Sequence, residues 1–254
     1  MDKGMEQTYH STGFHEKLNQ LKDMIDKSNY TVIFSGAGMS TEAGLPDFRS
    51  SSTGIWKNIN PMKLASARAM YQKRDDFIHF YRHRVHGLQS CHPHIGHILL
   101  ANWEKEGRIQ SIITQNVDGF HHHAGSQNVI ELHGTLRTCH CQECGAIFNI
   151  KKFLEDPLVC KCGGFIRPSV VLFGEPLPDE AMERAEHDTN LAELFIVMGS
   201  SLMVSPANLF PIEAKRHGAK LVILNMEQTE LDHEANLVIH GEKIGHILQL
   251  LSNE

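Results

Sequence analysis

Residues 31–49 read TVIFSGAGMSTEAGLPDFR, a short apolar run followed by a glycine loop. The run TVIFS is rich in β-branched residues and stops at a glycine, which is typical of a buried strand that feeds a loop. Gly36 and Gly38 follow it, and glycines there let a backbone approach a pyrophosphate beside a helix N-terminus. A simple dinucleotide fingerprint continues with glycine at position 41, where this chain has Thr41. The loop taken alone therefore also fits an ordinary turn.

Strands and helices alternate along the rest of the chain. The segments RIQSIITQN, NVIELHG, ELFIVMGSS and KLVILN contain continuous apolar runs, as the buried strands of a parallel sheet do. Residues 15–28, 179–192 and 241–251 have helical character, and PANLFPIEAKRHG begins with proline and stops at glycine, as helices do. This order predicts an α/β fold with a doubly wound, Rossmann-like parallel sheet.

Composition and charge argue against nucleic-acid-binding and membrane proteins. The chain has 254 residues, of which 41% are hydrophobic and 21% charged, so it can bury a sizeable core. Its net charge of −6 with neutral histidine argues against a broad nucleic-acid footprint, and we expect no nucleic-acid partner. No apolar run reaches the length of a membrane span, and the polar N-terminus has no apolar signal-peptide core. We therefore expect a cytoplasmic protein that does not associate with membranes.

The cysteines are clustered, because five of the six fall between positions 139 and 162. In a reducing compartment such clustering favours a metal over disulfides. Cys141-x2-Cys144 and Cys160-x-Cys162 are separated by fifteen residues, and two thiolate pairs so spaced suit tetrahedral zinc. Cys139 offers a further thiolate, which leaves the ligand choice open, and a redox pair is the alternative. A site closed by four thiolates would be structural, because no position is open for a substrate.

Polar groups follow several predicted strands, at the end where ligands bind in an open α/β sheet. Gln115, Asn116 and Asp118 can hydrogen-bond an amide and ribose hydroxyls, although they also suit a polar turn. His133 is a candidate general base, although a lone histidine after a strand is more often structural. The segments 199–201 and 225–227 carry hydroxyl and carboxamide groups that suit phosphate and ribose. We expect the histidine run 121–123 on the surface of a helix or loop, and metal binding is the alternative.

Together and in this order, these motifs resemble the sirtuins, the NAD-dependent protein lysine deacylases. The matching stretches are GAGMSTEAGLPDFRS, TQNVDGFHHHAG, ELHG, the two cysteine pairs, RPSVVLFGE, GSSLMVSP and Asn225. The resemblance implies a single sirtuin-type catalytic domain, with NAD and zinc as cofactors and acyl-lysine proteins as substrates. Its expected parts are an NAD-binding portion (residues 30–52, 101–136 and 168–254), a helical insert (53–100) and a zinc-binding insert (137–167).

The resemblance also implies roles for residues of this chain. His133 matches the catalytic histidine. After the acyl-lysine oxygen has displaced nicotinamide, this histidine deprotonates a ribose hydroxyl, which attacks the resulting imidate, and water then releases lysine and O-acyl-ADP-ribose. Val171, Phe173 and Gly174 match the segment that binds the peptide by strand addition. The zinc ligands would be Cys141, Cys144, Cys160 and Cys162. The NAD site would comprise Gly36, Ala37, Gly38, Thr41, Asp47, Phe48, Arg49, Gln115, Asn116, Val117, Asp118, Gly199, Ser200, Ser201 and Asn225.

Three alternatives to a plain deacetylase stay open. Tyr81 and Arg84 have the Tyr-x-x-Arg spacing of sirtuins that prefer succinyl or malonyl groups, since arginine pairs with a carboxylate, although an arginine-rich exposed helix has the same pattern. The same pocket would also serve an NAD hydrolase or an ADP-ribosyltransferase. The non-enzymatic alternative is a zinc-ribbon binding module.

Overall fold

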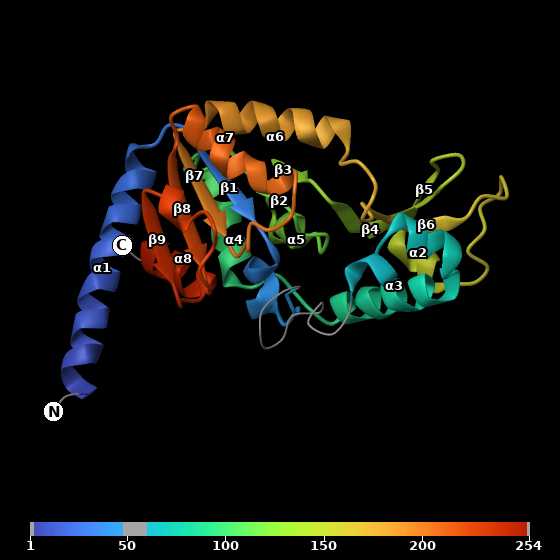
Figure 1. Ribbon diagram of the computed structural model, residues 1–254, viewed down its shortest axis with the longest axis horizontal. Helices are drawn as coiled ribbons and strands as arrows, with labels where there is room; N and C mark the ends of the chain where they lie inside the picture. The colour runs from blue at the N-terminus through green and yellow to red at the C-terminus, as the bar shows by residue number, and fades with distance from the viewer. Residues whose placement is uncertain (1–2, 48–59, 253–254) are drawn as a thin grey trace.

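The structure, a computed structural model, describes residues 3–47 and 60–252, with side chains from residue 13 onward except at position 61. Within these residues the predicted doubly wound sheet is present, with six parallel strands in the order β3-β2-β1-β7-β8-β9 (Figure 1). The strands are β1 (Thr31–Ser35), β2 (Ser111–Thr114), β3 (Val129–Glu131), β7 (Leu194–Met198), β8 (Lys220–Asn225) and β9 (Leu237–His240). The order reverses between β1 and β7, which is where such sheets bind ligands.

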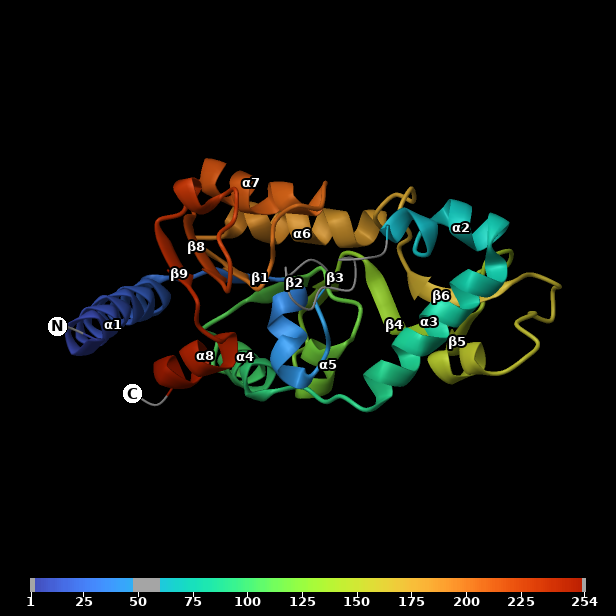
Figure 2. The same ribbon diagram turned by 60° about the horizontal axis from the view of Figure 1, so that its bottom comes forward.

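Helices cover both faces of this sheet, which explains the continuous apolar runs of its central strands. Every residue of β1, β2 and β7 is buried, and Ile33 lies between Ile112 and Ile196 in the register. One face packs against α1 (Lys3–Lys27), α4 (Ile95–Lys105) and α8 (Ile244–Ser252), and the other against α6 (Asp179–Leu191) and α7 (Phe210–Arg216). Figure 2 shows α6 and α7 on one side of the sheet and α4 and α8 on the other.

A second, smaller sheet lies beyond β3. It is antiparallel, in the order β5-β4-β6, and consists of β4 (Gly134–Cys141), β5 (Ile147–Asn149) and β6 (Ile166–Val170). Its core includes Phe77, Tyr81 and Val85, so α3 packs against it (Figure 1). The helical segments of this part are α2 (Ala67–Gln72), α3 (Arg74–Gln89) and two 3-10 helices, Pro61–Lys63 and Ile150–Leu154.

The expectation for the glycine loop was correct, and that for the histidine run was wrong at one residue. The glycine loop leads into a helix, the 3-10 helix Ala37–Ala43, and the Gly36 and Gly38 amides donate to the carbonyls of Met198 and Gly199 at the neighbouring strand end. The histidine run forms α5 (Phe120–Ala124), but His121 is 2% exposed and contacts Ser35 instead of lying on the surface. The remaining 3-10 helices are Ala207–Leu209 and Asp232–Glu234.

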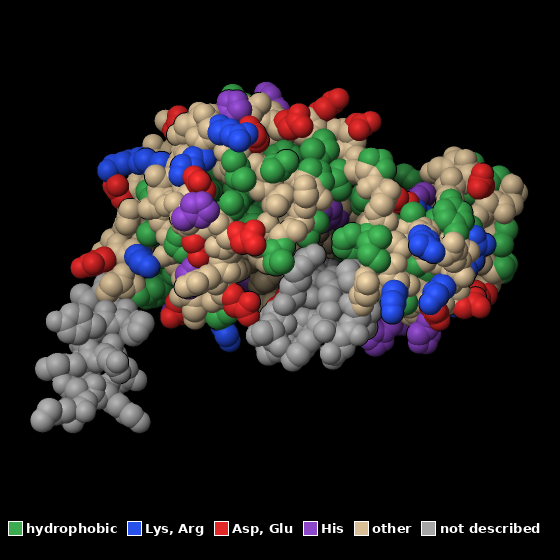
Figure 3. All heavy atoms as spheres, viewed as in Figure 1, with side chains coloured by type: hydrophobic (Ala, Val, Ile, Leu, Met, Phe, Trp, Pro, Cys, Tyr) green, Lys and Arg blue, Asp and Glu red, His purple; other side chains and the backbone are tan. Residues whose placement is uncertain are grey.

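The surface of the described part of the chain carries both signs of charge. On the face in Figure 3, Asp and Glu side chains are interspersed with Lys and Arg side chains. Among the described helices, none combines the length and the apolar character that crossing a bilayer requires.

Candidate active site

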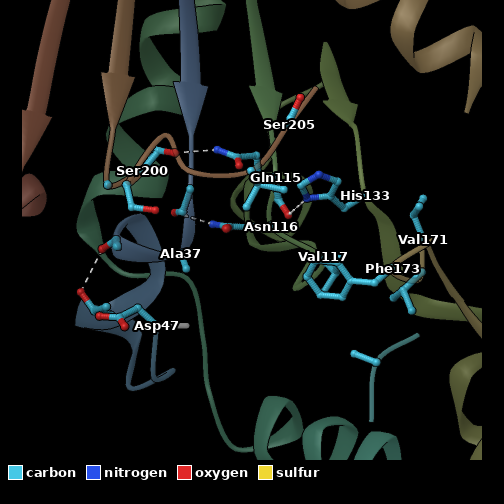
Figure 4. A pocket seen from close by; sticks show the side chains of 18 of the residues that line it. Ala37, Asp47, Gln115, Asn116, Val117, His133, Val171, Phe173, Ser200 and Ser205 are labelled. Carbon is cyan, nitrogen blue, oxygen red and sulfur yellow. Dashed lines mark hydrogen bonds between the residues drawn. The ribbon is translucent and has the colours of Figure 1, made fainter. Parts of the chain in front are cut away.

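A cavity of about 800 Å³ opens at the carboxyl ends of the parallel strands, where residues from both sheets meet (Figure 4). That volume suits a small-molecule or cofactor site. The structure brings most of the predicted site residues into its wall, although they come from segments far apart in the sequence. Those that line it are Gly36, Ala37, Gly38, Thr41, Asp47, Tyr81, Arg84, Gln115, Asn116, Val117, His133, Val171, Phe173, Gly174, Gly199, Ser200, Ser201 and Asn225.

Among the described residues predicted for the NAD and peptide sites, Asp118 is not in that wall. Asp118 lies behind it, 7% exposed, and its carboxylate accepts hydrogen bonds from Ser40 Oγ at 2.8 Å and from the Phe120 amide at 2.9 Å. Burial raises the pKa of Asp118, and these two bonds oppose the rise. Phe48 and Arg49 lie outside the described residues.

The loops that follow β1 and β7 touch through bare backbone. A Cβ atom on Gly36 would lie 2.7 Å from the Gly199 carbonyl oxygen, and one on Gly38 would lie 2.8 Å from the Gly199 Cα. Gly199 has φ +64°, and a Cβ atom there would lie 2.3 Å from the Met39 nitrogen. Side chains at these three positions would separate the loops, so the glycines keep open a backbone cradle that fits a diphosphate.

Two carboxamides connect the strand ends around this cradle. Asn116, which is 4% exposed, donates from Nδ2 to the Gly36 carbonyl at 2.9 Å, and Gln115 donates from Nε2 to Ser200 Oγ at 2.7 Å (Figure 4). The ends of β1, β2 and β7 are therefore held in one arrangement by side chains that also face the cavity.

His133 occupies the corner between the two sheets. It follows β3 and directly precedes Gly134, the first residue of β4. Its Nδ1 lies 3.0 Å from the Gln115 carbonyl oxygen (Figure 4). Because a carbonyl oxygen can only accept, Nδ1 carries a proton, and in the neutral ring the lone pair is therefore on Nε2. The ring is thereby oriented as a base.

Helix α3 contributes an aromatic and a cationic group to the cavity wall. Tyr81 is 2% exposed, and burial raises the pKa of its hydroxyl to about 12. Arg84 lies beside it, with Cζ 5.9 Å from the Tyr81 ring centre. Burial lowers the pKa of Arg84, while Tyr81 and Asp118 raise it.

The four predicted cysteine ligands form a cluster away from the cavity. The sulfurs of Cys141, Cys144, Cys160 and Cys162 all lie within 4.8 Å of one another. Two of the pairs are 3.4 and 3.7 Å apart, and tetrahedral zinc with Zn–S bonds of about 2.3 Å sets sulfurs about 3.8 Å apart. Cys139 is not part of the cluster, since its Sγ donates to the Asn149 carbonyl at 3.3 Å and burial raises its pKa to about 11. The chain therefore has a closed, structural four-thiolate site for zinc.

Several residues of the wall were missed by the sequence argument. They are Glu42, Ala65, Val170, Leu172, Glu175, Pro176, Leu177, Met182, Val204, Ser205, Pro206, Glu242, Lys243 and Ile244. Some of them continue motifs already singled out, GSSLMVSP and RPSVVLFGE, so reading each motif to its end would have found them. Lys243 and Ile244 carry no local signal, because only the position of α8 brings them to the cavity.

The fold and the site together define an α/β protein that binds a nucleotide at the switch point of its sheet and carries a structural zinc site. The profile of the Sir2 family matches residues 36–206. The chain belongs to the Sir2 family, as the sirtuin resemblance predicted.

Relatives and solved structures agree with this assignment over most of the chain. It is 57% identical to NAD-dependent protein deacetylase 1 of Geobacillus kaustophilus (strain HTA426) over 227 residues, which is 89% of this chain and 94% of the relative. It is 53% identical to NAD-dependent protein deacetylase of Oceanobacillus iheyensis over 234 residues, 92% of this chain and 99% of the relative.

A Sir2 structure with p53 peptide and NAD+ superposes with a TM-score of 0.85 at 34% identity, covering 93% of this chain and 97% of that one. A structure of Sir2 bound to an acetylated peptide superposes with a TM-score of 0.83 at 33% identity and the same coverage.

Proposed function

We propose that the protein is an NAD-dependent protein lysine deacylase, which removes acetyl groups from lysine side chains and releases nicotinamide and O-acetyl-ADP-ribose. One observation carries this proposal: His133 shares a cavity with a glycine cradle and with the segment that contains Val171 and Phe173. A site that only hydrolyses NAD does not require a segment of the protein that binds a peptide. The relatives named above are deacetylases, which supports the same reaction.

Different residues bind NAD and accept the proton in this reaction. NAD supplies the ribose carbon that the acyl oxygen attacks, and it is consumed as a substrate. The cradle of Gly36, Gly38 and Gly199 holds the diphosphate with backbone amides. His133 accepts a proton from a ribose hydroxyl at Nε2, while its Nδ1–H stays bonded to Gln115. The remaining NAD contacts are assigned to Ala37, Thr41, Asp47, Phe48, Arg49, Gln115, Asn116, Val117, Ser200, Ser201 and Asn225. Asp118, which lies behind the cavity wall, supports this site through its bond to Ser40.

The peptide substrate adds as an extended strand along Val171, Phe173 and Gly174. Backbone bonds already hold this segment, since the Val171 amide donates to the His133 carbonyl and the Phe173 amide donates to the Ala65 carbonyl, both at 2.9 Å. A strand that is fixed before the peptide arrives has little entropy left to lose on binding. The absence of a nucleic-acid or membrane partner and the cytoplasmic location remain predictions from the sequence.

A second candidate activity is the removal of succinyl or malonyl groups. It is favoured by the position of Tyr81 and Arg84, which lie in the cavity wall rather than on an exposed helix face. A guanidinium there can pair with the carboxylate of an acidic acyl chain. Loss of succinyl-lysine turnover in Arg84→Ala, with acetyl-lysine turnover retained, would assign this activity to Arg84.

The test uses purified protein with acetyl-lysine and succinyl-lysine peptides, each with and without NAD. Mass spectrometry follows the lysine peptide, nicotinamide and O-acyl-ADP-ribose. We expect NAD-dependent acyl removal that is abolished in His133→Ala and retained in His79→Ala, which changes an exposed histidine of α3. Release of nicotinamide while both peptides stay acylated would instead indicate NAD hydrolysis.

A further inference from the structure

The proposed peptide segment is joined to the interior of the small sheet by a buried ion pair. Arg167 of β6 is 5% exposed, and its two terminal nitrogens lie 2.5 and 2.8 Å from the two carboxylate oxygens of Glu175. The contact is bidentate, which fixes the direction of both side chains. Glu175 also lines the cavity, so the pair reaches from the core of the sheet to the cavity wall.

The same two side chains bond to the backbone of the segment between them. Arg167 Nη2 donates to the Val170 carbonyl at 2.7 Å, and the Leu172 amide donates to Glu175 Oε2 at 2.8 Å. The Glu175 amide in turn donates to the Leu172 carbonyl at 2.9 Å, and Gly174 in this turn has φ +92°. Residues 170–175 are therefore closed into a loop whose start, middle and end all bond to one ion pair.

Glu175 is ionised, as an ion pair with Arg167 requires. Partial burial works to raise the pKa of its carboxyl, but the bonds from Arg167 and the Leu172 amide outweigh burial and lower the pKa below 4.5. The carboxylate is thus ionised at neutral pH. The other titratable groups that face the pair are His140 of β4, which bonds to Ser169 at 3.1 Å, and Tyr81 of α3.

We propose that Arg167 and Glu175 are positioning residues, which hold residues 170–175 in the geometry that accepts the acyl-lysine peptide; this inference rests on the proposed function. The ladder of β6 ends at Val170, and beyond it the segment has separate backbone bonds at Val171 and Phe173 in place of a continuous sheet. The ion pair adds to this order before the peptide binds, which lowers the cost of binding. Neither residue acts on the reacting atoms. The expected effect of breaking the pair therefore falls on peptide KM.

A purely structural role makes a different prediction. If the pair only stabilised the fold, its loss would lower the thermal midpoint and leave peptide KM as it is. The chain offers a control in Arg82 and Asp156, a more exposed arginine–carboxylate pair, whose arginine also donates to a backbone carbonyl, that of Phe153. Neither residue of that pair lines the cavity.

The experiment compares full-length wild type, Glu175→Gln, Glu175→Asp, Arg167→Lys and the control Asp156→Asn. Steady-state kinetics with an acetyl-lysine peptide at saturating NAD give kcat and peptide KM, and calorimetry gives the Kd for NAD alone. For Glu175→Gln we expect peptide KM to rise about tenfold or more, with kcat and the NAD Kd within about twofold of wild type. Arg167→Lys keeps the charge but loses the planar fork, so its KM rises as well.

The conservative variant decides between positioning and fold stability. Glu175→Asp keeps the carboxylate on a shorter chain, and we expect it to recover part of the KM increase. Wild-type peptide KM in Glu175→Gln, or an equal rise in Asp156→Asn, would overturn the proposal. If Glu175→Gln does not fold, a wild-type KM in folded Glu175→Asp and Arg167→Lys would overturn it too. A wild type that removes no acyl group would instead refute the proposed function.

Discussion

At the scale of one residue, Gly199 is the position where a single methyl group should disable the nucleotide site. It combines φ +64° with a Cβ position 2.3 Å from a backbone nitrogen, which no side-chain rotation can relieve. We expect Gly199→Ala to lower the free energy of unfolding by about 1–3 kcal/mol, through backbone strain and overlap. Because the overlap pushes apart the two loops of the cradle, the Kd for NAD should rise about tenfold or more. Denaturant titration and calorimetry measure the two effects.

Gly107 provides the control for that substitution. It has φ +75°, but a Cβ atom there would have nothing within 4 Å. Gly107→Ala therefore introduces the left-handed strain alone, about 1 kcal/mol, and should leave NAD affinity unchanged. An unaltered NAD Kd in Gly199→Ala would show that the contact between the two loops does not shape the site.

The positions of some site residues can be predicted from the sequence, whereas the burial of His121 cannot. Gln115, Asn116 and His133 could be predicted, because polar groups directly after buried strands gather at one edge of a parallel sheet. The burial of His121 could not, because three consecutive histidines have no periodicity that says which one faces inward. Its direction depends on Ser35 of β1, whose Oγ lies 2.9 Å from the His121 Nε2. That contact exists only after β1 and α5 have packed.

At the scale of elements, α4 and α5 pack through histidines that should make stability depend on pH. His97 is 0% exposed and its ring centre is 4.9 Å from that of His121. Burial lowers the pKa of His97 far below 6.5 and that of His121 to about 3. Between these values and 6.5 the unfolded chain binds more protons than the folded one. Stability is therefore full above pH 6.5 and falls as the pH drops, by up to about 1.4 kcal/mol per pH unit for each histidine.

Urea denaturation at pH 7.5, 6.5 and 5.5 measures this dependence. We expect His97→Gln to reduce the slope of unfolding free energy against pH by about one proton, whatever it does to stability at pH 7.5. His79→Gln is the control, because His79 is exposed on α3. If both variants kept the wild-type slope, the buried histidines would not be the groups that respond to acid.

The elements themselves were predicted unevenly. Strands β1, β2, β7 and β8 follow from continuous apolar runs, which a sheet covered on both faces requires. Strand β9 was missed because its four residues alternate between buried and partly buried. The small sheet was missed as well, since the core of β4 includes cysteines and its pairing with β6 has a register shift between Gly134 and Cys139. A local pattern cannot show a pairing that a metal site and a distant strand determine together.

At the scale of the whole molecule, β4 and β6 connect the zinc site to the active site. Cys141 pairs with Ile166 at the zinc end, and Gly134 pairs with Val170 at the other, directly beside His133 and Val171. Eight residues of strand span about 25 Å, so the metal cannot act on the substrate itself. Bound to the four cysteines, zinc would hold the two strands in register, and through them His133 and residues 170–175. The cradle residues belong to the large sheet and do not depend on this connection.

Removal of zinc should therefore weaken peptide binding without weakening NAD binding. We expect a chelated protein, or Cys144→Ser, to lose most deacylation and peptide binding, because metal binding contributes directly to the folding of a small metal-held unit. NAD affinity should stay within about threefold of wild type, since the large sheet keeps its own core. Zinc analysis, circular dichroism and calorimetry with NAD and peptide in turn provide the readouts, with Cys91→Ser as the control because Cys91 lies outside the cluster. Full deacylation by zinc-free protein would show that β4 and β6 hold their register without the metal. Equal loss of NAD and peptide binding would show instead that the two sheets fold as one cooperative unit.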